Sequence, residues 1–180
     1  AGIVISLFIK NNDDNNMVTE DELRAMVEVS HEDGVIEKEE KKMIVNVVDF
    51  GDTVAGDIML PRVDMVMVSV ESSYEEILKI FREERYTRIP VYEESPYNVI
   101  GILNVKDFLL IEDKENFSVK EHLREPLYTY EYKKTSSLMV DMRKTGANIV
   151  IVLDEYGTTV GLITLEDMLE EIVGEIRDEF

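Results

Sequence analysis

The sequence contains no cysteine, and basic residues are few. Without cysteine, disulfide bonds and thiolate metal sites are excluded. The chain has 19 lysine and arginine residues against 39 aspartate and glutamate residues, a formal net charge of −20. Because this charge repels a phosphate backbone, we expect no nucleic acid among its partners. We interpret the acidic excess as the solvated surface of a helix-rich protein.

Long hydrophobic runs are also missing. The longest, AGIVISLFI at residues 1–9, is far shorter than the roughly 20 apolar residues of a spanning helix. It lacks the basic start and the small-residue cleavage site of a signal peptide. By composition it is either the cut end of a membrane segment or a strand that packs locally. The 44% apolar content suffices for one substantial core or two small ones.

Two phrases of nearly the same letters indicate an internal duplication: GILNVKDF at 101–108 and GLITLEDM at 161–168. Their first glycines are 60 positions apart, too far for a solenoid repeat but suited to a duplicated supersecondary unit. Apolar periodicity and turn residues predict the order strand, helix, strand, strand, helix in both halves. Residues 88–107 align with 148–167 without a gap. Upstream of these residues, the two halves align only with a shift of one residue, which predicts that the helix-to-strand loop is one residue shorter in the second half.

Helix-end signals precede and follow the duplicated part. Thr19 and Glu22 have the spacing of a capping box, which predicts a helix from residue 19. A second helical pattern is expected to stop at Gly51. The final helix is expected to turn its apolar residues inward: Leu165, Met168, Leu169, Ile172 and Ile176.

Two other functional classes find little support. In the polar run at residues 11–16, a calcium loop starting at Asn11 would lack the glycine at its sixth position and a carboxylate at its first. For an enzyme, no nucleophile–base pair, metal cluster or glycine-rich phosphate loop is present. His31 and His122 lie in polar, helix-like surroundings and are expected at the surface. We therefore expect neither calcium binding nor catalysis.

The second repeated phrase has the residues of an anion site. A strand that ends near Gly161 permits close approach to its backbone, and a helix that begins near Thr164 presents free N–H groups and a hydroxyl. Asp167, one turn later, could accept hydrogen bonds from a ribose diol. The same two residues, Thr164 and Asp167, also fit an ordinary capping box. On the residues alone, the capping box is the preferred interpretation.

Three longer stretches resemble a known family: DIMLPR, YTRIPVYEESPYNVIGILNVKDFL and ANIVIVLDEYGTTVGLITLEDMLEEIVGEIRDEF. Together they are similar to the tandem CBS (cystathionine β-synthase-type) pair of CorC/hemolysin C-like transporters, relatives of the cyclin M magnesium transporters. The resemblance covers residues 17–180. It implies an α+β fold of two CBS repeats related by pseudo-twofold symmetry, after a helical lead-in. The implied parts are a membrane-proximal remnant at 1–18, connecting helices at 19–53, and repeats at 54–115 and 116–180.

The resemblance also implies a function. The chain would be a regulatory module on the cytoplasmic side of the membrane, part of a magnesium or cobalt transporter. It would bind AMP or ATP, with Mg²⁺ accompanying ATP, and would form a homodimer that contacts the membrane domain of its parent chain. The alternative is a ligand-free dimerisation module of the same membrane protein.

By position, the resemblance assigns one competent nucleotide site built from both repeats. Its residues are Tyr86, Thr87, Arg88, Ile89 and Pro90 of the first repeat with Thr164 and Asp167 of the second. Arg88 would bind phosphate, while Tyr86, Ile89 and Pro90 would wall the adenine.

The other site departs from the family pattern. It retains Asp107 but has Asn104 where threonine or serine is usual, and its opposite wall would be Gly146, Ala147 and Asn148. Since that wall offers neither an aromatic ring nor an arginine, we expect this site to be degenerate or empty.

Overall fold

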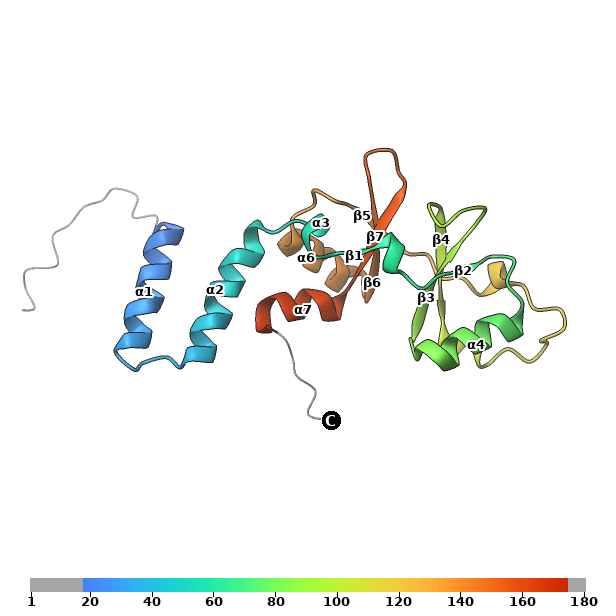
Figure 1. Cartoon of the computed structure of the whole chain (residues 1–180), viewed down its shortest axis with the longest axis horizontal. Coiled ribbons are helices and arrows are strands. Elements are labelled where there is room, and N and C mark those ends of the chain that lie inside the picture. Colours follow the sequence, from blue (N-terminus) through green and yellow to red (C-terminus); the bar gives the residue numbers. More distant parts are fainter. Residues whose placement is uncertain (1–17, 175–180) are drawn as a thin grey trace, which may run out of the picture. The chain divides into compact units, whose positions relative to one another are not determined.

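The computed structural model describes residues 18–174, which form parts of two compact units, residues 1–45 and 46–180 (Figure 1). Four predictions fall on segments outside the described residues. These are the membrane-proximal stretch at 1–9, the polar loop at 11–16, the absence of a calcium loop starting at Asn11 and the inward position of Ile176. Within residues 18–174, no helix is long and apolar enough to cross a bilayer.

The first unit contains helix α1, Glu20–Glu32, and the beginning of α2, Lys38–Asp52. The predicted capping box is confirmed, because Thr19 N donates to Glu22 Oε2 at 2.9 Å and Glu22 N donates to Thr19 Oγ1 at 3.2 Å. Helix α2 continues one residue past the predicted stop at Gly51 and ends at Asp52. A glycine costs a helix about 1 kcal/mol, which is too little to fix the last residue by itself.

The second unit holds two repeats with the predicted order of elements. The first consists of β2 (Val68–Ser69), α4 (Tyr74–Glu84), β3 (Arg88–Tyr92), β4 (Val99–Asn104) and α5 (Val105–Phe108). The second consists of β5 (Leu127–Tyr130), α6 (Thr135–Thr145), β6 (Ile149–Leu153), β7 (Thr159–Thr164) and α7 (Leu165–Val173). In each, the first strand pairs in parallel with the second, and the last two strands pair antiparallel. The expected α+β fold of tandem repeats is confirmed.

The two repeats exchange the segments that precede them. A short helix, α3 (Ala55–Ile58), and strand β1 (Leu60–Pro61) come before the first repeat, yet β1 pairs antiparallel with β7 of the second. Conversely, the stretch after the 3₁₀ turn Val119–His122 joins the first repeat, where Arg124 forms an antiparallel bridge with Ile102 of β4. The repeat boundaries 54–115 and 116–180 stay a prediction. Under these boundaries, β1 belongs to the first repeat but pairs with the second, and Arg124 belongs to the second but pairs with the first.

The strand register corrects the sequence alignment of the repeats. Arg88 pairs with Asn104 in the first repeat, and Ile149 pairs with Thr164 in the second, so Ile149 is the counterpart of Arg88. The helix-to-strand loops have the same length, 85–87 and 146–148. The one-residue difference instead lies in the hairpins, 93–98 and 154–158. The gapless alignment and the shorter loop predicted in the second half are therefore wrong, because hairpin loops change length without disturbing the core.

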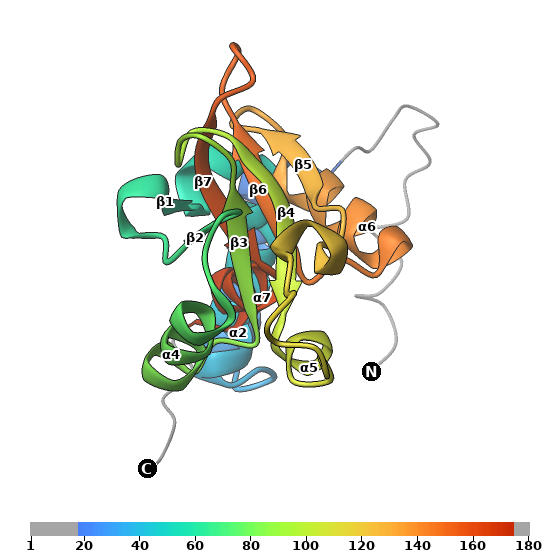
Figure 2. The ribbon, with the colours of Figure 1, turned by 90° about the vertical axis from the view of Figure 1, so that its right-hand side faces the viewer.

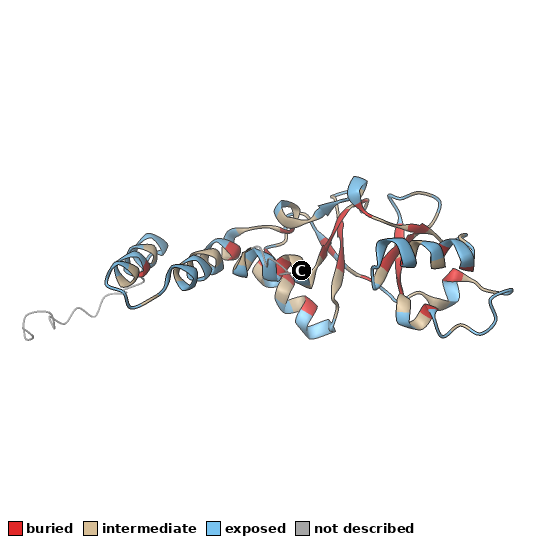
Figure 3. Cartoon of the chain, turned by 60° about the horizontal axis from the view of Figure 1, so that its bottom comes forward, coloured by how far each residue is buried: buried red, intermediate tan, exposed pale blue. Residues whose placement is uncertain are grey.

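Each repeat has its own hydrophobic core, and a third cluster joins them. Figure 2 shows the strands and helices of both repeats, and Figure 3 shows buried residues on them in red. The first core is rich in aromatic residues: the ring of Phe108 stacks on Tyr74 with centroids 4.4 Å apart. The second is aliphatic and includes Phe50 and Ala55 from the segment before the first repeat. On α7, Leu165, Met168 and Ile172 pack into this core as expected, whereas Leu169 is 44% exposed, contrary to the prediction.

Three hydrogen bonds tie the repeats together near the third cluster. Thr159 N donates to Tyr97 O at 2.9 Å, Val99 N donates to Thr159 Oγ1 at 3.4 Å, and the Tyr128 hydroxyl donates to Val99 O at 2.8 Å. Burial raises the pKa of Tyr128, and the charge of Glu125 adds to that effect. The tyrosine therefore keeps its proton, and the hydrogen bond, through neutral and mildly alkaline pH.

Candidate functional site

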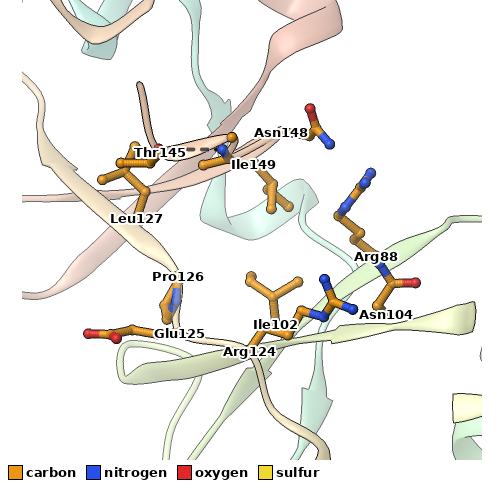
Figure 4. A pocket seen from close by; sticks show the side chains of 12 residues that line it. Arg88, Ile102, Asn104, Arg124, Glu125, Pro126, Leu127, Thr145, Asn148 and Ile149 are labelled. Carbon is orange, nitrogen blue, oxygen red and sulfur yellow. Dashed lines mark hydrogen bonds between the residues drawn. The ribbon is translucent and has the colours of Figure 1, made fainter. Parts of the chain in front are cut away.

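Two clefts lie where the helix-to-strand loops of the repeats meet the strands of the opposite repeat. The small cleft has a volume of about 200 Å³ and is lined by Tyr86, Thr87, Arg88, Asn148, Ile149, Thr164 and Glu166. The large cleft has a volume of about 430 Å³ and is lined by Arg88, Ile102, Asn104, Arg124–Leu127 and Thr145–Ile149 (Figure 4). Arg88, Asn148 and Ile149 border both, so the two clefts adjoin.

The small cleft brings together part of the predicted nucleotide site. Tyr86 and Thr87 from the loop before β3, and Arg88 at the start of β3, line it together with Thr164 at the start of α7. Tyr86 is half exposed, so its ring is accessible to a ligand. Arg88 forms no ion pair with a carboxylate of the described residues. Arg88 Nη1 donates to Thr87 Oγ1 at 3.4 Å. A phenol ring, a guanidinium without an ion pair among the described residues and a hydroxyl thus surround one space.

The other predicted residues of the site are placed differently. Ile89 is fully buried in the first core, because side chains alternate along β3 and Ile89 points away from Arg88. Pro90 is buried opposite Ile102 and does not line the cleft. Asp167 does not line it either, whereas its neighbour Glu166 does. Sequence reasoning missed Glu166, although its place within the repeated phrase was the available signal.

Thr164 and Asp167 form a complete capping box. Thr164 N and Oγ1 both donate to Asp167 Oδ2 at 2.7 Å, and Asp167 N donates back to Thr164 Oγ1 at 3.2 Å. The interpretation of these residues as a capping box is therefore correct. The capping box leaves Asp167 Oδ1 able to accept a hydrogen bond, and it fixes the carboxylate in place. A capping role and a binding role are thus compatible.

Gly101 and Gly161, the first residues of the two repeated phrases, leave room for the exchanged segments. A side chain on Gly161 would meet Leu60 O at 2.6 Å and Met59 Sδ at 2.8 Å, and one on Gly101 would meet Leu123 Cδ1 at 2.8 Å. The close approach expected at Gly161 is therefore made by the chain itself. Glycine is required at both positions because the exchanged segments lie directly against the strand backbone.

The large cleft contains the residues expected of the degenerate site. Asn104 lies across from the loop residues Gly146, Ala147 and Asn148, as the sequence suggested. Asn104 Oδ1 accepts a hydrogen bond from Lys106 N at 2.9 Å, which caps α5. Asp107 does not line the cleft, since both of its carboxylate oxygens bind Arg124, at 2.7 and 3.0 Å. Arg124, which the sequence did not single out, is the main charged group that the prediction lacked.

Comparison with known proteins identifies the repeats. The CBS domain family model matches residues 55–113 and 123–174. The UPF0053 protein YrkA of Bacillus subtilis is 39% identical over 100% of this chain and 43% of its own length. The magnesium and cobalt efflux protein CorC of Escherichia coli is 35% identical over 89% of this chain and 56% of its own length. The chain thus spans about half the length of these curated relatives.

Solved structures agree with the fold. The CBS domain of a bacterial CNNM/CorC family Mg²⁺ transporter superposes with a TM-score of 0.83 at 38% identity, covering 90% of this chain and 100% of that one. The same kind of domain in complex with ATP gives 0.73 at 39% identity, over 77% and 99%. A CBS-domain pair with bound AMP from Klebsiella pneumoniae gives 0.60 at 30% identity, over 68% and 99%. The chain belongs to the CBS domain family and contains a tandem pair of these domains, homologous to those of CorC and hemolysin C.

Proposed function

We propose that this CBS pair binds one adenine nucleotide, AMP or ATP, in the small cleft. The proposal is carried by the meeting of Tyr86, Thr87 and Arg88 of one repeat with Thr164 of the other around a single space. The ATP and AMP complexes of solved relatives support it. A nucleotide is larger than the small cleft alone, so part of it would extend toward the large cleft that adjoins at Arg88.

Each lining group has a chemical role in this proposal. Arg88 offers a forked donor to phosphate oxygens. In the first turn of the nine-residue helix α7, the N–H of Glu166 adds a donor, because those of Leu165 and Asp167 already donate to Asn148 O and Thr164 Oγ1. The hydroxyl of Thr164 would add another by leaving Asp167 Oδ2 for a phosphate oxygen. Although Asp167 does not line the cleft, its Oδ1 could accept from a ribose placed at the edge of the cleft, and the exposed ring of Tyr86 would cover the base. Ile89 and Pro90 support that wall from within the core without touching the ligand.

Magnesium is expected to accompany ATP but not AMP. The chain carries a net charge of −20, and Glu166 lines the small cleft beside the phosphate donors. A triphosphate would bring further negative charge to this position, and a bound Mg²⁺ would neutralise part of it. Among the described residues, no group of three or more His, Asp or Glu side chains could hold a metal ion by itself. The nucleotide would therefore supply most of the ligands.

The biological role that we propose is regulation of a magnesium or cobalt transporter. The module would lie on the cytoplasmic side of the membrane, pair with a second copy and contact the membrane domain of its parent chain. Nucleotide binding between the repeats would change how they sit against one another. It can shift this equilibrium only as far as its affinities for the two arrangements differ. The module itself would perform no catalysis.

Calorimetric titration with AMP tests the site. We expect one AMP per chain, and a loss of affinity of about tenfold or more in Asp167→Ala and in Tyr86→Ala, because each removes a direct ligand contact. Asp107→Ala is the matched control, since Asp107 is the counterpart of Asp167 in the first repeat and should leave AMP binding unchanged. Two equal sites per chain, or undiminished binding in both variants, would contradict the assignment.

One observation favours a second candidate, a dimerisation module without a ligand. The capping box already satisfies Thr164 and one oxygen of Asp167 without any nucleotide. If neither AMP nor Mg–ATP binds at millimolar concentration while sedimentation shows a dimer, this candidate replaces the first. Nucleotide binding instead raises the free energy of unfolding by about 2.7 kcal/mol at a ligand concentration 100 times the dissociation constant.

A further inference from the structure

The large cleft collects hydrogen-bond donors on one face of the first repeat's sheet. Arg88 of β3 pairs with Asn104 of β4, and two residues earlier on β4, Ile102 bridges to Arg124. Since strand side chains alternate, residues 102 and 104 and their cross-strand partners lie on the same face. Figure 4 shows Arg88 and Arg124 extending from the two sides of this face toward the same space. We propose that the large cleft is an oxyanion site, in which Arg88 and Arg124 bind phosphate groups.

The polar groups of the cleft suit an anion. Arg88 has no carboxylate partner among the described residues, and Arg124 shares its charge only with Asp107. Asn104 uses its carbonyl oxygen to cap α5, which leaves its NH₂ group free to donate. Asn148, on the opposite wall, adds a second amide. Glu125 is the one acidic residue that lines the cleft, and the cleft presents two guanidinium groups despite the strongly acidic chain, although a phosphate would compete with Asp107 for Arg124.

The cleft does not suit a complete adenine nucleotide. At the positions that correspond to Tyr86 and Arg88, the opposite wall has Ala147 and Ile149, which offer neither a ring to cover a base nor a second charge. Asp107 has both oxygens engaged by Arg124 and therefore cannot accept from a ribose diol. A volume of about 430 Å³ is ample for a chain of phosphates. These residues can therefore bind phosphate groups, but they offer nothing to bind the base of a nucleotide.

The phosphates could come from two sources. One is a free anion such as tripolyphosphate. The other is the terminal phosphates of a nucleotide whose base lies in the small cleft, because Arg88, Asn148 and Ile149 border both clefts. The second source rests on the proposed function, and the first does not. In the second case, Arg124 would distinguish ATP from AMP.

Titration of the whole chain with sodium tripolyphosphate, AMP and ATP tests the site. Arg124→Ala should weaken tripolyphosphate binding by about tenfold or more, as expected for loss of a charged hydrogen bond. Its backbone pairing with Ile102 does not depend on the side chain, so the variant should fold, which thermal unfolding checks. Asp107→Asn should strengthen binding, because it frees Arg124. Arg143→Ala, an exposed arginine of α6 outside both clefts, is the matched control.

The outcomes separate the two sources and the two proposals. If Arg124→Ala weakens tripolyphosphate and leaves the ratio of ATP to AMP affinity unchanged, the cleft takes a free anion. If that ratio also falls, the site receives the nucleotide's terminal phosphates. If neither quantity responds to Arg124→Ala, or Arg143→Ala has the same effect, the oxyanion site is refuted. AMP binding that depends on Asp167 would still stand in that case, so the proposed function can survive this failure.

Discussion

The two repeats share one backbone plan but fill it with different side chains. In the first core, Phe108 lies among the rings of Tyr74, Phe81 and Phe117, with centroids 4.4 to 5.7 Å away. Its counterpart in the second core is Met168, which packs among aliphatic residues. The second core is closed by Phe50 and Ala55 from outside the repeat. Duplication has therefore preserved the register of the strands while the packing diverged.

The two clefts also differ in their side chains at equivalent backbone positions. The exchanged segment places Arg124 opposite Ile102 in the first repeat, and Leu60 opposite Leu162 in the second. An arginine at one of these equivalent positions and a leucine at the other give the large cleft a charge that the small cleft lacks on that side. Binding chemistry in this fold is thus set by the residues of the exchanged segments as well as by the repeated phrases.

The largest expected effect tests the difference between the cores. Phe108→Ala should lower the free energy of unfolding by about 3–5 kcal/mol, and Met168→Ala by about 2–5 kcal/mol. We expect Phe108→Ala to cost more, because three neighbouring rings lose their partner. Urea denaturation measures both, with Leu110→Ala, at a residue 79% exposed, as the control that should change little. An equal cost at both positions would mean that the aromatic cluster adds nothing beyond its volume.

A smaller effect is expected at the repeated glycines. Gly161→Ala should destabilise the fold by about 1–3 kcal/mol, because its methyl group would meet the backbone oxygen of Leu60. Gly101→Ala should cost less, because its nearest obstacle is the flexible side chain of Leu123. Thermal unfolding of the two variants gives the order. If Gly101→Ala proves the more harmful, the exchange of segments does not explain the glycines.

The smallest effect concerns the helices that follow each first strand. Helix α4 has a capping box, in which Ser73 N and Oγ donate to Glu76 Oε2 at 2.8 and 2.9 Å. Helix α6 begins at Thr135, and its N-cap residue, Lys134, forms no side-chain hydrogen bond to the first turn. The backbone N–H of Ser73, followed by its hydroxyl, lowers the pKa of Glu76 below its ordinary value. The ionised form is therefore favoured in the folded state.

The ionised Glu76 therefore stabilises the fold at pH values above the ordinary pKa of a glutamate. This stabilisation is lost as the pH falls through the lower pKa that Glu76 has in the folded state. Glu76→Gln should be less stable than the parent at pH 7, and the gap should close below about pH 4. Urea midpoints across this range measure it. Glu75→Gln, in the same turn but outside the box, should show a smaller gap. A gap that persists in acid would mean that the ionised carboxylate is not its cause.

Much of the fold could be predicted from local patterns. The capping boxes at Thr19 and at Thr164, the order of elements and the duplication all follow from residues close in the sequence. The errors arose where local patterns were ambiguous or were overridden by packing. Gly51 was expected to end a helix that continues to Asp52, and Leu169 was expected to point inward on a helix where only Leu165, Met168 and Ile172 reach the core.

Part of the candidate site could also be predicted, but its completion could not. The sequence by itself determined that Thr164 starts a helix beside a carboxylate, and that the opposite loop carries Tyr86 and Arg88, because those are properties of short segments. Only the tertiary structure decided that Glu166 rather than Asp167 faces the cleft, and that Arg124 joins Arg88. The position of Arg124 depends on the exchange of segments between repeats, and that of Glu166 on the packing of α7 beside the loop of the other repeat. Both arrangements bring together residues far apart in the chain, so no local pattern in the sequence reports them.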